Sequence, residues 1–154
     1  MLPHPRHEER LERIAARLHS AEATNSALLA EFIAQACIRI ASATPAAKAR
    51  LDRLIEAAAW TNAALALLEL ELPAWTLRRL VREDGEWFCS LSQHPCLPLG
   101  LDDLAVASHQ CLPLAILLAL VEARSAAGES VRSPRTVPNV GPGSAYQVCC
   151  DNFR

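Results

Sequence analysis

Two short segments, HPCLPLG at residues 94–100 and HQCLPLA at residues 109–115, place a histidine two positions before a cysteine. The chain has only five His and six Cys, so the repetition draws attention. With one more cysteine upstream, the segments supply enough nitrogen and sulfur donors for a tetrahedral zinc site. The candidate donors are Cys89, His94, Cys96, His109 and Cys111. A zinc- or thiol-dependent module is therefore one hypothesis for this chain.

The spacing of these donors argues against a metal site. Structural zinc sites usually take two ligands from a tight Cys-x-x-Cys turn, whereas the close pairs here are His-x-Cys. His94 and Cys96 face the same way if their segment is extended, but His109 and Cys111 fall at a predicted helix start, where residues two apart diverge by roughly 200°. We expect no metal and no cofactor, with Cys89 and Cys111 acting as small buried hydrophobic residues.

Other patterns that support catalysis are weak. The sequence has no GxSxG motif and no glycine-rich phosphate loop, and its five glycines are not clustered before a helix. Asp102 and Asp103 are adjacent, so their carboxylates diverge, and an Asp before a helix is more often a cap. We interpret the Glu8-Glu9 and Glu69/Glu71 pairs as solvated faces, Cys37 as a core residue, and Cys149-Cys150 as exposed thiols. We expect no enzyme.

Three arginines, Arg78, Arg79 and Arg82, form the one basic cluster of interest. With Phe88 predicted on the Arg78/Arg82 face, they could contact nucleic acid, for which a basic surface with aromatic side chains is typical. Acidic residues lie beside them, and Arg82 is predicted to pair with Glu86 across a hairpin. A nucleic-acid-binding accessory protein is the second hypothesis.

The elements that position these residues follow from composition and periodicity. The 154 residues are 51% hydrophobic and 5% aromatic, with net charge −2, which predicts one domain, or one small domain with an appendage, and gives no general attraction to nucleic acid or anionic membranes. The N-terminus lacks the apolar core of a signal peptide, and no apolar run reaches the roughly 20 residues of a membrane span. We expect a soluble, cytoplasmic protein with reduced cysteines.

Residues 1–72 are predicted to form a helical hairpin. An apolar stripe at spacings of three and four predicts that residues 6–43 form one long helix or two nearly collinear ones. Thr44 is a predicted N-cap and Pro45 a predicted first helical residue. The second helix is predicted to end before Pro73. Such stripes on two long helices also favour self-association.

Residues 75–91 alternate as a strand pair around Glu83-Asp84-Gly85. A three-residue loop with Gly85 in the left-handed conformation predicts that Val81 faces Trp87 and Leu77 faces Leu91. One face then holds these apolar side chains, with Arg79 as a misfit. The opposite face carries a small apolar patch of Leu80 and Phe88. We expect Arg78, Leu80, Arg82 and Phe88 to form an interaction surface.

After a proline-bearing loop, a helix is predicted from Ser108 to Ala127, apolar on nearly every face and lying against the hairpin and the N-terminal helices. Pro113 is tolerated near its start. The predicted organisation is a helical hairpin at 1–72, a β-hairpin plus helix module at 73–128 sharing one core with it, and a disordered tail at 129–154. The fold class is α+β, mostly α, with a two-stranded β-hairpin.

The segments WTLRRLV, DGEWFCSL and LPLAILLALVEA, within residues 73–127, resemble modules of uncharacterised bacterial proteins and are similar in outline to the phage-type ABA sandwich domain. The resemblance implies a sheet held between helices and no catalytic residue. It covers about a third of the chain. Together with the unpaired edges of a small sheet, it leads us to expect a non-enzymatic interaction protein of bacterial or phage type that binds a protein partner or self-associates as a homo-oligomer.

Overall fold

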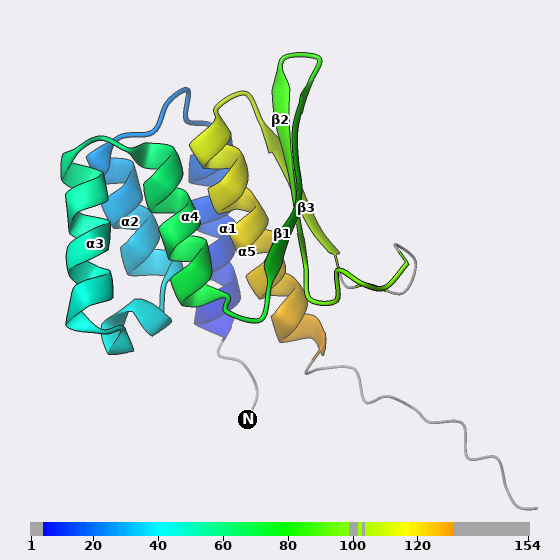
Figure 1. Ribbon diagram of the computed structural model, residues 1–154, viewed down its shortest axis with the longest axis horizontal. Coiled ribbons are helices and arrows are strands. Elements are labelled where there is room, and N and C mark those ends of the chain that lie inside the picture. Colours follow the sequence, from blue (N-terminus) through cyan, green and yellow to red (C-terminus); the bar gives the residue numbers. More distant parts are fainter. Residues whose placement is uncertain (1–4, 99–101, 103, 131–154) are drawn as a thin grey trace, which may run out of the picture.

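The computed structural model describes residues 5–98, 102 and 104–130. Within this part, the chain forms five α-helices, a short 3-10 helix and a three-stranded antiparallel sheet in the order β1-β2-β3. Figure 1 shows two layers, with the helices on one face of the sheet. The predicted α+β, mostly helical class is confirmed, but the sheet has three strands and not two.

The first two helices fold back on each other. Helix α1 (Pro5–His19) and helix α2 (Ser26–Ala36) pack side by side, and the chain reverses direction between them (Figure 1). Asn25 caps α2 by accepting the Leu28 amide at 2.8 Å. The prediction of one long or two collinear helices is therefore wrong. The apolar stripe kept its phase because both helices turn their stripes towards the same core.

A second reversal divides the next predicted helix into α3 (Pro45–Glu56) and α4 (Trp60–Glu71). The predicted Thr44 cap and Pro45 start of α3 are confirmed. The break falls at Ala58, which has a φ of 53°. The Ala58 amide donates to the Ile55 carbonyl and the Ala59 amide to the Leu54 carbonyl, which is a Schellman motif built on alanine where glycine is usual.

Strands β1 (Thr76–Glu83) and β2 (Glu86–Ser92) form the predicted hairpin with a different turn. Only Asp84 and Gly85 connect them, with φ values of 50° and 87°, as in a type I′ turn. The three-residue loop is wrong, and Val81 lies opposite Phe88 instead of Trp87. A β-bulge at Arg78 restores the register, so the predicted Leu77–Leu91 pair is confirmed.

Strand β3 (Leu104–His109) was not predicted. It pairs antiparallel with β2, so the predicted helix start at Ser108 is wrong, and α5 (Leu112–Ser130) begins four residues later with Pro113 in its first turn. Helix α5 contacts α1, α4, β2 and β3 and is buried throughout residues 114–121, as the apolar sequence predicted. It extends into the segment expected to be a tail. Residues 131–154, including Cys149-Cys150, lie outside the described residues.

Candidate interaction surface

The bulge at Arg78 decides which side chains of β1 face the helices. Leu77 and Leu80 pack against the core, opposite Leu91 and Cys89 of β2. Val81 and its cross-strand neighbour Phe88 therefore lie on the outer face. The predicted outer patch of Leu80 and Phe88 is wrong in its first member, because the shorter turn and the bulge shift the alternation of β1. Arg79 also lies on the outer face and is no misfit.

No helix of the described residues covers the outer face of the sheet (Figure 1). Its apolar side chains come from all three strands, and Val106 of β3 is 56% exposed. A shallow hollow of about 210 Å³ lies between them. Its outer-face lining consists of Arg79, Glu83, Phe88, Ser90, Leu104 and Val106. The surface is thus mixed, with apolar residues in the middle and charged residues at the edge.

The three arginines of the predicted basic cluster are engaged separately. Arg78 forms an ion pair with Asp102, with 2.5 Å between Nη1 and Oδ2. Arg79 pairs with Glu83 at 2.7 Å. Arg82 lies opposite Trp87 and not Glu86, with its guanidinium carbon 5.9 Å from the indole centroid. Arg78 is half-buried, so the structure does not join these cations into one exposed patch.

Asp102 organises the loop between β2 and β3. Its carboxylate, which is 0% exposed, accepts hydrogen bonds from Arg78, from the Ser92 hydroxyl and from the His94 amide, the last at 3.0 Å. Burial alone would raise the pKa of Asp102, but these hydrogen bonds outweigh it and hold the pKa below its usual range. The interpretation of Asp102 as a helix cap is wrong, because strand β3 and not a helix follows it.

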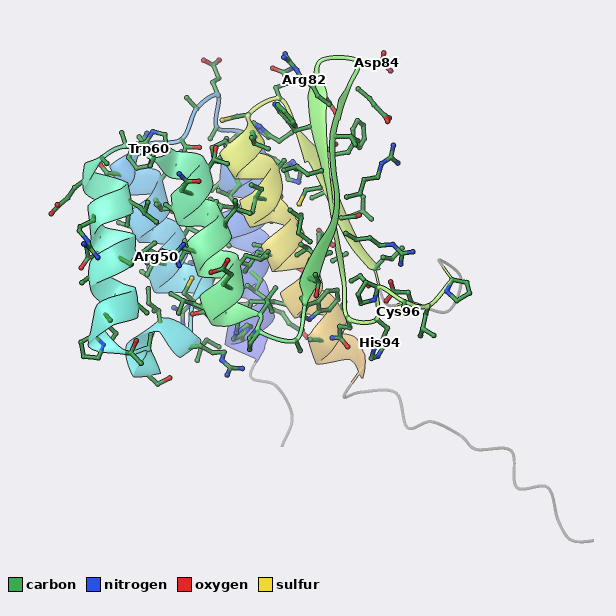
Figure 2. All side chains as sticks on the ribbon, in the orientation of Figure 1. Arg50, Trp60, Arg82, Asp84, His94 and Cys96 are labelled. Atoms are coloured by element: carbon green, nitrogen blue, oxygen red, sulfur yellow. The ribbon has the colours of Figure 1, made fainter. Side chains whose placement is uncertain are left out.

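The histidines and cysteines considered as zinc donors, against which the spacing argued, are spread along the sheet and its loops. His94 and Cys96 lie exposed on the loop after β2, far from Arg82 and Asp84 at the hairpin tip (Figure 2). His109 pairs with Trp87 near that tip, and its Nδ1 accepts the Cys111 amide at 2.9 Å. Within the described residues, no group of three His, Cys, Asp or Glu side chains is placed to hold a metal ion.

Cys37 and Cys89 have little thiolate character. Burial raises the pKa of Cys89, which points into the core, to about 11. Burial and the nearby charge of Glu71 raise the pKa of Cys37 to about 12. Cys111 lies with its sulfur 3.7 Å from the Thr24 hydroxyl. The prediction that Cys37 and Cys89 are core residues agrees with these positions.

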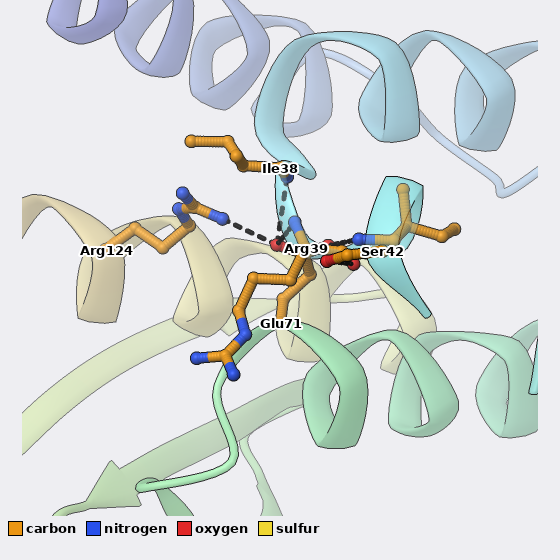
Figure 3. Close-up of polar contacts among 6 residues, drawn as sticks. Ile38, Arg39, Ser42, Glu71 and Arg124 are labelled. Carbon is orange, nitrogen blue, oxygen red and sulfur yellow. Dashed lines mark hydrogen bonds and ion pairs between the residues drawn. The ribbon is translucent and has the colours of Figure 1, made fainter. Parts of the chain in front are cut away.

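Sequence reasoning missed a buried carboxylate in the helical layer. Glu71, predicted to be solvated, has a side chain that is 0% exposed. It accepts the backbone amides of Ile38, Arg39 and Ile40 at 2.7–3.0 Å, at the start of the 3-10 helix η1 (Arg39–Ser42), and the guanidinium of Arg124 at 2.8 Å (Figure 3). Glu71 therefore joins η1, α4 and α5, which is a structural role.

The edge of the sheet at β1 is less covered by helices than the rest. Strands β2 and β3 lie on α5, whereas β1 makes few contacts with any helix. Beside β1, α4 and the start of the strand enclose an apolar groove of about 440 Å³. Its apolar lining consists of Leu65, Leu68, Leu72, Pro73, Trp75 and Leu77. An open strand edge and an apolar groove thus occur side by side.

No protein-family model, curated protein or solved structure matches this chain. Among the described residues, no helix has the length and apolar character that crossing a membrane requires. The resemblance to the ABA sandwich domain therefore stays a prediction.

Proposed function

We propose that this chain is a non-enzymatic interaction protein that forms homo-oligomers through its sheet layer. The observation that carries the proposal is the edge strand β1, which makes few helical contacts and borders an apolar groove of about 440 Å³. An edge strand presents unpaired N–H and C=O groups, which favour pairing with another strand. A second copy of β1 supplies the complementary N–H and C=O groups, so the simplest partner for this edge is the same edge of another chain.

The distribution of exposed apolar side chains supports the same layer. The large apolar residues most exposed within the described part are Ile38, Leu97 and Val106, and two of the three belong to the sheet or its loop. Phe88 and Val81 add a half-buried pair in the middle of the outer face. In the helical layer, by contrast, the apolar stripes already pack against one another.

Nucleic-acid binding, the second hypothesis, gains no support from the arrangement of the arginines. Arg78 and Arg79 are neutralised by carboxylates within 2.7 Å, and Arg82 stacks on Trp87. A gel-shift measurement at physiological salt tests this directly. Binding that survives and then falls in Arg78→Ala and Arg82→Ala variants would favour nucleic acid over self-association.

The proposal is tested by the oligomeric state in solution. We expect light scattering after size exclusion, and native mass spectrometry without chelator, to give a mass of two or more chains at micromolar concentration. The species should persist after nuclease treatment. A single-chain mass at every concentration up to about 100 µM, a range in which weak but specific contacts form, would overturn the proposal.

A further inference from the structure

The backbone groups of β1 that face its open edge can be identified from the turn. Glu83 and Glu86 flank the two-residue turn, where the flanking residues form a hydrogen-bonded pair. Hydrogen-bonded and non-hydrogen-bonded pairs then alternate along an antiparallel ladder. Val81 therefore directs its backbone N–H and C=O towards β2. Leu80 and Arg82, which are its neighbours, direct theirs towards the open edge.

We infer that two copies of the chain pair β1 with β1 antiparallel about a two-fold axis at Val81, which joins the two sheets into one of six strands. This inference rests on the proposed self-association and specifies its interface. In this register Leu80 and the partner's Arg82 exchange backbone hydrogen bonds, and so do Arg82 and the partner's Leu80. A two-fold axis makes such a contact self-complementary.

The charges of β1 distinguish this register from its neighbours. An axis at Val81 sets Arg79, which already pairs with Glu83 of its own chain, opposite the partner's Glu83 as well, and symmetry repeats that pair. An axis at Leu80 would set Arg78 opposite the partner's Arg82, and an axis at Arg82 would set two copies of Arg82 opposite each other. Opposite charges across strands are favourable and like charges are unfavourable. The sequence LRRLVRE therefore matches itself best about its valine.

The same axis joins the apolar parts of both surfaces. Val81 and Phe88 are cross-strand neighbours on the outer face, so pairing at Val81 creates a continuous apolar strip across the centre of the six strands. Leu77 lies at the apolar groove, two residues before Arg79, and in this register Arg79 faces the partner's Glu83 at the end of the partner's β1. The partner's hairpin tip would then stand at the mouth of the groove.

Disulfide trapping tests the register. In a background of Cys96→Ser, Cys149→Ser and Cys150→Ser, we expect Val81→Cys to form a covalent dimer in air, because directly opposed residues of a non-hydrogen-bonded pair lie about 4.5 Å apart at Cα, within disulfide reach. Arg79→Cys and Glu83→Cys should each stay monomeric on non-reducing gels when alone. Mixed together, they should form a disulfide-linked heterodimer.

Charge reversal gives an independent measurement without cysteine chemistry. Arg79→Glu and Glu83→Arg should each weaken the dimer about tenfold, since each change sets like charges opposite each other at two symmetric positions. The double variant Arg79→Glu/Glu83→Arg should recover the wild-type dissociation constant in analytical ultracentrifugation. Circular dichroism and the melting temperature show that each variant folds.

The outcomes separate this inference from the proposed function. A dimer that shows neither the Val81 cross-link nor the Arg79–Glu83 cross-link overturns the β1 interface but leaves self-association intact. A protein that is monomeric at every concentration overturns both. A dimer that is cross-linked at Val81 and restored by the double reversal supports both.

Discussion

Two carboxylates, Glu71 and Asp102, are fully shielded from solvent, and each binds one arginine and at least one backbone amide. Glu71 receives three consecutive amides and Arg124, and it connects segments 31–53 residues apart in sequence. Asp102 receives one amide, one hydroxyl and Arg78, from residues 8–24 positions away. The first closes the helical layer, and the second fixes only one loop of the sheet layer.

The difference between the two carboxylates shows which layer of the fold still has groups available to a partner. In the helical layer, the apolar stripes pack against one another and Glu71 accepts the amides at the start of η1. Among the buried side-chain atoms of the described residues, Gln35 Oε1 of α2 alone lacks a hydrogen-bond partner. In the sheet layer, Asp102 fixes the loop between β2 and β3, but β1 is an edge strand, and its outward backbone groups have no strand partner among the described residues. We therefore expect the interaction surface in the sheet layer, where Asp102 joins only residues that are closer in sequence than those joined by Glu71.

The largest expected effect is in the helical layer. Glu71→Ala should lower the free energy of unfolding by about 3–5 kcal/mol, because it leaves a buried Arg124 and three amides without their acceptor. Urea unfolding followed by circular dichroism measures the change. The control is Glu69→Ala, where an exposed carboxylate 3.7 Å from Arg50 should contribute between about 0 and 1 kcal/mol. Equal losses in both variants would contradict the structural role of Glu71.

The effect of Asp102 is expected to be smaller and to depend on pH. Arg78 is 24% exposed and can turn to water, unlike the more enclosed Arg124. The folded-state pKa of Asp102 lies below that of the unfolded chain, so its stabilisation is present above the unfolded value, about 3.9, and is lost as pH falls through the folded value. Wild type should therefore lose stability on acidification more steeply than Asp102→Asn.

Urea unfolding at several pH values between 7 and 3 tests this slope. The control is Asp84→Asn in the hairpin turn, because asparagine also tolerates the φ of 50° at that position. Asp84→Asn should keep the wild-type slope below pH 4. Parallel curves for wild type and Asp102→Asn would show that the hydrogen bonds of Asp102 do not favour its ionised form.

Capping residues and apolar periodicity correctly predicted those elements whose local conformational preference matches their place in the folded chain. The Thr44-Pro45 start, the buried helix around Leu114 and the existence of the hairpin follow from capping chemistry and periodicity. Strand β3 was missed because LAVASH is short and follows a proline-rich loop, which resembles the approach to a helix. The break at Ala58 was missed because an alanine run favours helix and carries no stop signal.

The candidate interaction surface was harder to predict, because the side chains that β1 shows on each face depend on the length of one turn and on one bulge. The two-residue turn places Leu80 inward and Val81 outward, and the bulge at Arg78, which nothing local marks as unpaired, returns Leu77 to the inner face. The buried state of Glu71 was also hidden, since LELEL at residues 68–72 alternates like a solvated face, and its amide donors lie more than 30 residues away. Registers and long-range partners are set by packing, which one sequence does not display.

The smallest expected effect tests whether the closed helical layer is also free of local strain. Ala58 is in the left-handed region at a φ of 53°, which costs an alanine roughly 1–2 kcal/mol. Ala58→Gly removes that cost but adds backbone entropy of about 0.5–1 kcal/mol to the unfolded chain, so we expect stabilisation of about 0.5–1 kcal/mol in urea. Ala57→Gly, at a φ of −78°, should instead destabilise. Destabilisation by Ala58→Gly of the same size as by Ala57→Gly would show that the helical layer holds Ala58 without strain.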